Sequence, residues 1–132
     1  ERNALKVIHD QIGAPTSTSL IAKVTTDAIQ AIKQGKAWPQ GIYHLAPQGK
    51  SSWHEIAQTL IAYAEQQQVP MRIHAGDIQA ISTAEYPTPA QRPLNSQLDT
   101  PKLRSQLSFG LPHWKDGFLA VASDIVKELG TV

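Results

Sequence analysis

Short apolar runs and helix-spaced apolar residues alternate along the first half of the chain. The short apolar run 5–8 (Leu-Lys-Val-Ile) predicts a strand. The strand should end at the following loop, which contains Gly13 and Pro15. A helix is expected after it, ending at Gly35, with N-caps among residues 16–19 and apolar residues at helical spacing: Ile21, Val24, Ala28 and Ile32. The run 42–45 (Ile-Tyr-His-Leu) predicts a second strand.

The second half begins with a capping box. Ser52 and Glu55 have the spacing at which a hydroxyl and a carboxylate satisfy two free backbone amides reciprocally, so they open a helix that is expected to end near Gln68. Strands are predicted at 71–74 and 78–81. A short helix with Leu103 and Leu107 should follow Thr100–Pro101, and a last helix should end at Gly130 with this apolar face: Trp114, Phe118, Val121, Ile125 and Leu129.

The alternation of strands and helices favours an α/β fold with short parallel strands and crossover helices. Five prolines between residues 87 and 112 exclude long regular elements there: Pro87, Pro89, Pro93, Pro101 and Pro112. The two strands predicted in the first half would form a sheet with exposed edges, which suggests a fragment cut from a larger sheet.

Composition narrows the class of protein. The 132 residues are 41% hydrophobic and 17% charged, which is enough apolar material for one domain with one core. Cysteine is absent, which excludes disulfides, thiolate metal sites and cysteine nucleophiles. The net charge of +1 argues against nucleic acid as a partner. No apolar run is long enough for a membrane span, and no signal-peptide pattern stands at the N-terminus.

Several catalytic motifs are missing. The sequence has no glycine-rich phosphate turn, no Gly-x-Ser-x-Gly elbow and no pair of histidines at the spacing of a helical metal site. Glu55 is the obvious carboxylate for acid–base work, but its capping role already explains it. No catalytic residue is therefore assigned to this chain.

Four segments, in order, resemble one family. Residues 10–16 read Asp-Gln-Ile-Gly-Ala-Pro-Thr, 41–45 read Gly-Ile-Tyr-His-Leu, and 52–55 read Ser-Trp-His-Glu. Residues 85–99 read Glu-Tyr-Pro-Thr-Pro-Ala-Gln-Arg-Pro-Leu-Asn-Ser-Gln-Leu-Asp and carry the most specific motif. Together they resemble the C-terminal part of dTDP-4-dehydrorhamnose reductase, an extended short-chain dehydrogenase/reductase.

The resemblance implies a fold and a reaction. The fold would be the C-terminal fragment of a Rossmann-type enzyme, with residues 1–50 as the last Rossmann strand–helix–strand elements and 51–132 as a small, loop-rich substrate-binding lobe. The parent enzyme would reduce dTDP-4-dehydro-L-rhamnose to dTDP-L-rhamnose with NADPH, for rhamnose and surface-polysaccharide synthesis in the cytoplasm. NADPH and the family's catalytic Tyr-x-x-x-Lys would belong to the N-terminal Rossmann part. No tyrosine of this chain has a lysine four residues later, so the chain alone is expected to be inactive. The resemblance also leaves open a homodimer, with Mg²⁺ at the dimer contact.

Five residues are candidates for binding the dTDP-sugar. Arg92 is the strongest, because a guanidinium binds a diphosphate bidentately; the alternative is an ion pair with Glu85 or Asp99. Gln11 would contact a sugar or a base, or stabilise its own loop. The others, which would bind sugar hydroxyls or close turns and caps, are Asn95, Ser96 and Thr16.

Three further interpretations belong beside this one. Trp53 and Trp114 start helical faces and are interpreted as core residues; the alternative is a platform on which a base stacks. A similar fold serves as the non-catalytic regulatory subunit of methionine adenosyltransferase, which would make the chain a protein-binding module. Another nucleotide-sugar reductase or epimerase of the same superfamily is the third reading, although the proline-rich segment around Arg92 favours the rhamnose branch.

Overall fold

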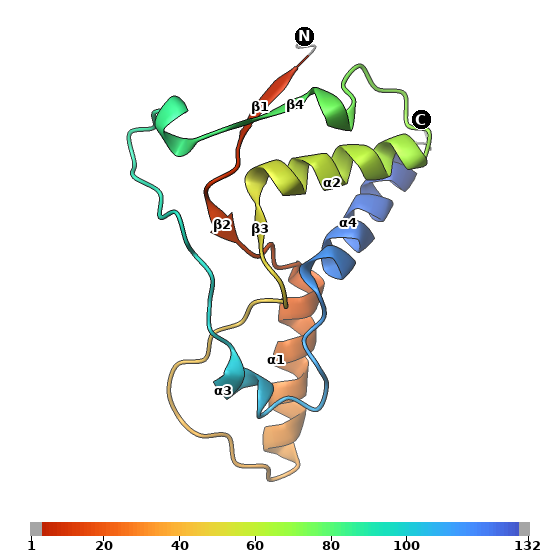
Figure 1. Ribbon diagram of the computed structural model, residues 1–132. Coiled ribbons are helices and arrows are strands. Elements are labelled where there is room, and N and C mark those ends of the chain that lie inside the picture. The colour runs from red at the N-terminus through yellow and green to blue at the C-terminus, as the bar shows by residue number, and fades with distance from the viewer. Residues whose placement is uncertain (1–3, 130–132) are drawn as a thin grey trace.

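Residues 4–129 are described by the computed structural model, and they form two lobes joined end to end (Figure 1). The upper lobe in that view contains β1 (Leu5–Ile8), α2 (Trp53–Gln66), η1 (Ala75–Asp77), β4 (Ile78–Ile81), η2 (Thr83–Glu85) and α4 (Trp114–Leu129). The lower lobe contains α1 (Thr18–Lys33) and α3 (Pro101–Arg104), and the short strands β2 (Ile12–Gly13) and β3 (Ser51–Ser52) lie between the lobes.

The upper lobe is built on a parallel pair of strands. β1 pairs with β4 in a register that runs from Leu5 opposite Ile78 to Ile8 opposite Ile81. The chain passes from one strand to the other through α2, which packs against both. The predicted strands 5–8 and 78–81 are confirmed, and so is the α/β class with parallel strands and a crossover helix.

Two predicted strands are wrong. Residues 42–45 pair with no strand among the described residues, because this segment lies in the lower lobe, where Tyr43 and Leu45 pack against the buried apolar cluster. There the ammonium of Lys102 donates a hydrogen bond to the carbonyl of Ile42 at 3.2 Å, and Ile42 is 82% exposed. Residues 71–74 lead into a tight turn instead, in which the Asp77 carboxylate accepts the backbone N–H of His74 at 2.9 Å.

The lower lobe has its own apolar cluster. Four buried residues form it, from α1, α3 and the segment that leads to α4: Leu20, Val24, Leu103 and Leu111. The predicted helix after residue 16 is confirmed, with Ser17 as its N-cap. Its expected apolar face is only partly right, because Ile21 and Ile32 are exposed while Leu20 takes the buried place beside Val24. α3 is a single turn, so Leu107 follows it instead of lying in it.

In the upper lobe, α2 packs against both strands and against α4. Trp114 is 1% exposed at the start of α4, and Ala122, Ala64, Ile78 and Ile81 are buried as well. α4 begins at Trp114 as expected, but Val121 and Ile125 are exposed. The expected helix end at Gly130 lies outside the described residues.

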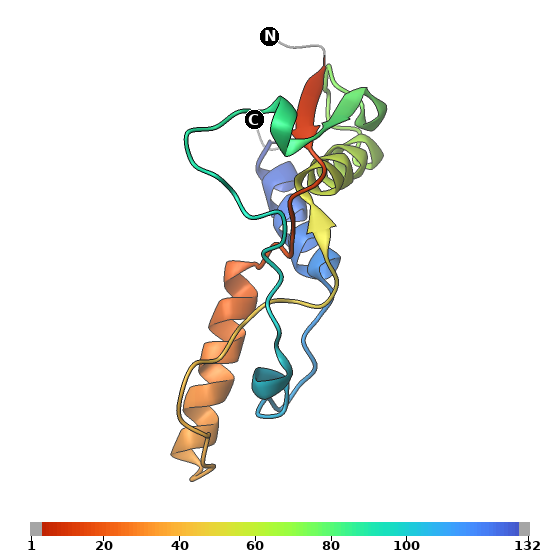
Figure 2. The ribbon, with the colours of Figure 1, turned by 60° about the vertical axis from the view of Figure 1, so that its left-hand side comes forward.

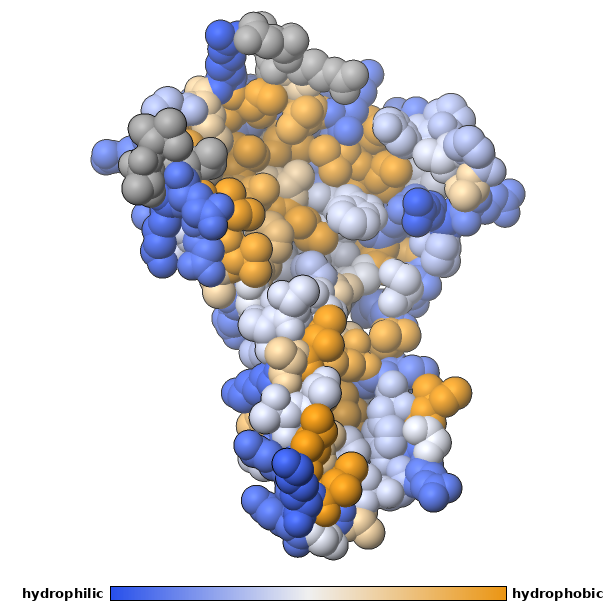
Figure 3. All heavy atoms as spheres, turned by 180° about the vertical axis from the view of Figure 1, so that it is seen from behind, coloured by the Kyte–Doolittle hydropathy of each residue, from blue (hydrophilic) through white to orange (hydrophobic). Residues whose placement is uncertain are grey.

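The molecule exposes more surface than its mass requires. Its accessible area is 9152 Å², against roughly 6,800 Å² for a compact protein of this mass. Figure 3 shows apolar side chains spread over the upper lobe and in a stripe down the lower one, and on α1 the exposed apolar residues are Ile21, Ile29 and Ile32. No helix within residues 4–129 combines the length and the apolar character needed to span a bilayer.

The start of α2 is fixed by two serines. Ser52 is the N-cap, and its hydroxyl accepts the backbone N–H of Glu55 at 3.1 Å, as expected. The Glu55 carboxylate accepts instead from the hydroxyl of Ser51 at 2.9 Å, and Ser51 is 3% exposed. The same carboxylate lies 3.4 Å from the ammonium of Lys115 on α4. Half of the predicted capping box is therefore replaced by contacts that join α2 to its neighbours.

Replacing Ser52 by alanine tests this cap. Ser52→Ala should lower the free energy of unfolding by about 1 kcal/mol, because the amide of Glu55 loses its acceptor at the helix start. Ser52→Thr keeps a hydroxyl and should lose less. Urea denaturation followed by circular dichroism measures both, and equal stability of the alanine variant and the parent would contradict the cap.

Candidate substrate-binding site

A long loop, residues 86–99, leaves η2, arches away from the upper lobe and returns beside β2 (Figures 1 and 2). Its return is fixed by backbone hydrogen bonds, because the amide of Ile12 donates to the carbonyl of Leu94 and the amide of Ser96 donates to the carbonyl of Ile12, each at 2.8 Å. On its other side β2 pairs with β3 in antiparallel fashion. The loop expected from the prolines is confirmed, and two residues of β2 join it to the start of α2.

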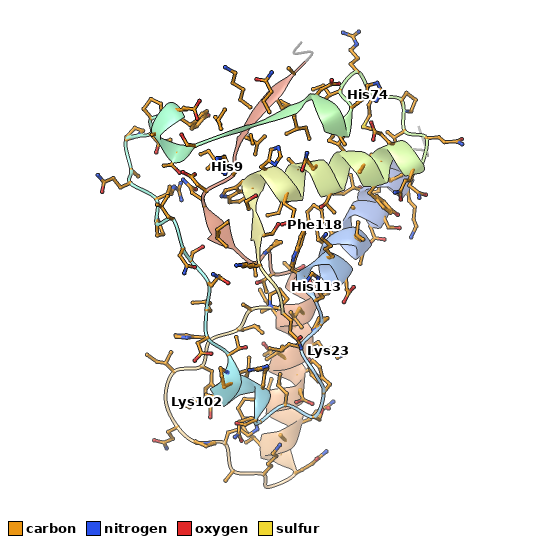
Figure 4. The ribbon with its side chains drawn as sticks, viewed as in Figure 1. His9, Lys23, His74, Lys102, His113 and Phe118 are labelled. Carbon is orange, nitrogen blue, oxygen red and sulfur yellow. The ribbon has the colours of Figure 1, made fainter. Side chains whose placement is uncertain are left out.

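Two cavities open where these segments meet. The first cavity has a volume of about 430 Å³ and lies between the loop 11–15, the N-terminus of α2 and the returning long loop, with Ile56 and Phe118 in its wall. In Figure 4, Phe118 lies between α2 and α4. The second cavity has a volume of about 580 Å³ and lies along β1, with Tyr86 and Thr88 on its far side. The two cavities share three lining residues: Gln11, Trp53 and Arg92.

The structure brings three of the five candidate residues to these cavities. Arg92 and Gln11 line both, and Ser96 lines the first. The amide nitrogen of Gln11 also donates to the hydroxyl of Thr83 at 3.2 Å, and the hydroxyl of Ser96 donates to the carbonyl of Ile12 at 3.1 Å. Gly13 permits this approach, because a Cβ there would lie 2.8 Å from the Ser96 hydroxyl.

The other two candidates lie outside the cavity walls. The side-chain oxygen of Asn95 accepts the backbone and side-chain N–H groups of Gln97, both at 3.0 Å. The hydroxyl of Thr16 donates to the carbonyl of Ala14 at 3.3 Å, and the cap of α1 is Ser17. Both side chains are engaged in local turns in this structure.

The charge of the walls is of one sign. Arg92 lines both cavities and Lys6 lines the second, and among the described residues no carboxylate lines either. Within residues 4–129, Arg92 forms no ion pair with Glu85 or Asp99. Glu85 instead accepts from the amide and the hydroxyl of Ser82, both at 2.8 Å, and these hydrogen bonds lower its pKa. The walls therefore suit an anion.

Trp53 is the lining residue that the sequence interpretation missed. Trp114 is buried as expected, but Trp53 is 59% exposed and faces both cavities. It shares a helical face with Ile56, yet it stands at the first position of α2, where that face reaches the cavities. The sequence feature that could have indicated this exposure is the position of Trp53 directly after Ser52, the N-cap of α2.

Asp10 fixes the loop that carries Gln11. Its two carboxylate oxygens accept the backbone N–H of Thr83 at 2.9 and 3.0 Å, and one accepts the Thr83 hydroxyl at 2.6 Å. These hydrogen bonds favour the ionised carboxyl and lower its pKa. Thr83 thereby holds Asp10 and Gln11 together at the carboxyl end of β1.

No three His, Asp or Glu side chains within residues 4–129 gather closely enough to hold a metal ion. The homodimer and its Mg²⁺ stay predictions.

Parallel strands joined by a crossover helix, with an anion-suited cavity beyond the end of β1, define an α/β ligand-binding unit of the Rossmann type. The chain belongs to the family described as the RmlD substrate binding domain, whose model matches residues 1–126.

Its relatives and structural neighbours include several dTDP-4-dehydrorhamnose reductases. It is 35% identical over 125 residues to the dTDP-4-dehydrorhamnose reductase of Shigella flexneri, a match that covers 95% of this chain and 41% of that protein. It superimposes on the dTDP-4-dehydrorhamnose reductase of Clostridium acetobutylicum with a TM-score of 0.71 at 27% identity, covering 96% of this chain and 40% of the other. For the enzyme of Bacillus anthracis in complex with NADP the TM-score is 0.66 at 27% identity, with 90% and 37% covered.

The chain spans about two-fifths of the length of the curated relatives it matches. These matches confirm the resemblance and the expected fold class. They favour the reductase over a regulatory subunit of the methionine adenosyltransferase type.

The contact between Asp10 and Thr83 should make stability depend on pH. A carboxyl whose pKa is lowered by folding stabilises the fold above its unfolded pKa and loses that contribution as the pH falls through the folded value. Asp10→Asn should therefore melt at a lower temperature than the parent at about pH 7, and the difference should shrink below about pH 4. Asp99→Asn, which removes an exposed carboxylate from the long loop, is the matched control and should change little. A difference for Asp10→Asn that does not vary with pH would contradict the assignment.

Proposed function

We propose that this chain is the substrate-binding part of a dTDP-4-dehydrorhamnose reductase, and that its two cavities receive a dTDP-sugar. The single observation that carries the proposal is the Arg92 guanidinium, which lies in the wall shared by both cavities, where no carboxylate from residues 4–129 stands beside it. A nucleotide sugar carries a diphosphate, and a planar guanidinium binds such a group through two parallel hydrogen bonds. The family and the names of the relatives support the same substrate class.

The other candidate residues take supporting roles in this proposal. Lys6 adds a second cation to the second cavity, and Gln11 and Ser96 offer an amide and a hydroxyl to sugar or base. Thr16 and Asn95 hold the turns on either side of β2, and a hydrogen bond from either to a sugar hydroxyl requires a rearrangement of its turn.

The reaction requires the rest of the parent protein. We propose that the N-terminal Rossmann part binds NADPH and supplies the Tyr/Lys pair, so that hydride passes to the 4-keto sugar held here. Residues 1–50 would be the last Rossmann elements and residues 51–132 the substrate-binding part, and each of these two sequence segments contributes elements to both lobes of the structure. The large exposed area and the apolar stripe on α1 support packing against that N-terminal part.

Arg92→Ala tests the site in the full-length parent. It should weaken binding of dTDP-rhamnose by roughly thirty- to a hundred-fold, since a charge-assisted bidentate contact contributes about 2 to 3 kcal/mol. Arg92→Lys should recover part of the loss, because an ammonium lacks the planar fork. NADPH affinity should hardly change.

Isothermal titration calorimetry measures these affinities, with thermal melts as a folding control. Arg104→Ala is the matched control, because Arg104 is an exposed arginine on α3 that lines neither cavity. If Arg92→Ala binds dTDP-rhamnose as tightly as the parent does, the site assignment fails.

The isolated 132-residue chain should not oxidise NADPH in the presence of dTDP-4-dehydro-L-rhamnose. Hydride transfer needs a bound nicotinamide and a proton donor beside the carbonyl, and this sequence contains neither the glycine-rich turn nor the Tyr/Lys pair. The absorbance of NADPH at 340 nm follows the reaction. Keto-sugar-dependent oxidation above a heat-killed control would overturn the proposed division of labour.

A further inference from the structure

Trp53 is a large apolar side chain left mostly in solvent. It is 59% exposed, whereas Trp114 is 1% exposed. An exposed tryptophan forgoes much of the stabilisation that burial of an aromatic side chain brings. It lies in the wall of both cavities, so the uncovered ring faces space that a ligand can fill.

The backbone that carries this ring is held on both sides. Before it, β3 pairs with β2 and the Ser52 hydroxyl caps the helix. After it, Glu55 is bound by the Ser51 hydroxyl and approached by Lys115 from α4. Trp53 therefore stands on a rigid element, which keeps the entropy cost of ordering a ligand-binding side chain low.

The residues around Trp53 indicate which kind of ligand it can bind. Arg92 and Gln11 line the same two cavities, and the first cavity continues over the apolar side chains of Ile56 and Phe118. A ligand that suits these walls carries an anionic group for Arg92 and, next to it, a ring with an apolar face. In a dTDP-6-deoxy-sugar two rings have an apolar face: the 6-deoxy sugar, which is bonded directly to the diphosphate, and the thymine base, which is joined to it through one deoxyribose.

We propose that Trp53 is the platform on which a ring of the nucleotide sugar stacks, beside the diphosphate bound by Arg92. This inference rests on the proposed function, and it makes Trp53 a binding residue with no part in proton or hydride transfer. It also explains why a tryptophan at the first position of α2 stays uncovered in a chain that buries Trp114.

The test compares two ligands and four variants in the full-length parent, by isothermal titration calorimetry. Trp53→Ala and Trp53→Leu should weaken dTDP-rhamnose binding roughly tenfold or more, because both remove the flat face. Trp53→Phe should stay within about threefold of the parent, since it keeps an aromatic ring. Leu98→Ala is the control, because Leu98 is 49% exposed on the long loop and lines neither cavity.

Titration with dTDP identifies the ring. A loss of affinity for dTDP as well as dTDP-rhamnose assigns the stacked ring to thymine, whereas a loss for dTDP-rhamnose alone assigns it to the sugar, and either result supports the platform. Wild-type affinity of Trp53→Leu for both ligands overturns it. Lowered melting temperature and NADPH affinity in Trp53→Leu, with unchanged dTDP-rhamnose affinity, also overturn it and assign Trp53 to an internal contact of the parent. If Arg92→Ala also binds dTDP-rhamnose as tightly as the parent does, the ligand does not bind in these cavities, and the proposed function itself is wrong.

Discussion

Two residues of extended backbone, Ile12 and Gly13, hold together three segments that lie far apart in the sequence. They pair with Ser51–Ser52 on one side and with the returning long loop on the other. Both cavities depend on this arrangement, because it places Gln11, Trp53 and Arg92 around the same space. A Cβ at position 13 would lie 2.8 Å from the Ser96 hydroxyl, so a larger residue there would displace this hydroxyl from its contact with the Ile12 carbonyl.

The strand pair supplies the fixed frame behind that contact. β1 ends beside β4, and the amide of His9 donates to the carbonyl of Ile81 at 2.9 Å just beyond the paired residues. The Asp10 carboxylate then accepts hydrogen bonds from the amide and the hydroxyl of Thr83. These bonds hold the loop that follows β1 next to the turn that follows β4. A loop of 14 residues that carries a cation can thus be exposed along much of its length and still have both ends fixed.

In the lower lobe, one side of α1 is covered by other segments and the opposite side is not. The lower lobe buries Leu20 and Val24 against α3, where Lys23 lies over the ring of Phe109 and Lys102 over that of Tyr43 (Figure 4). The outward side of α1 stays apolar and uncovered. Burial of apolar surface is the main favourable term in folding, so this stripe would gain from a further packing partner, in line with the proposed place of the chain within a longer enzyme.

Much of the fold could be predicted from local sequence. Helix starts at Ser17 and Ser52, strands at 5–8 and 78–81, and a proline-rich loop around Arg92 each depend on neighbours within a few residues, and the motif at 85–99 pointed to the family. Tertiary structure alone decided that β1 pairs with β4 and leaves 42–45 unpaired, that Glu55 turns to Ser51 and Lys115, and that Trp53 faces the cavities while Trp114 is buried. The spacing of residues along the chain indicates which of them lie on the same face of a helix or strand. Which other segment then packs against that face depends on contacts between residues far apart in the sequence.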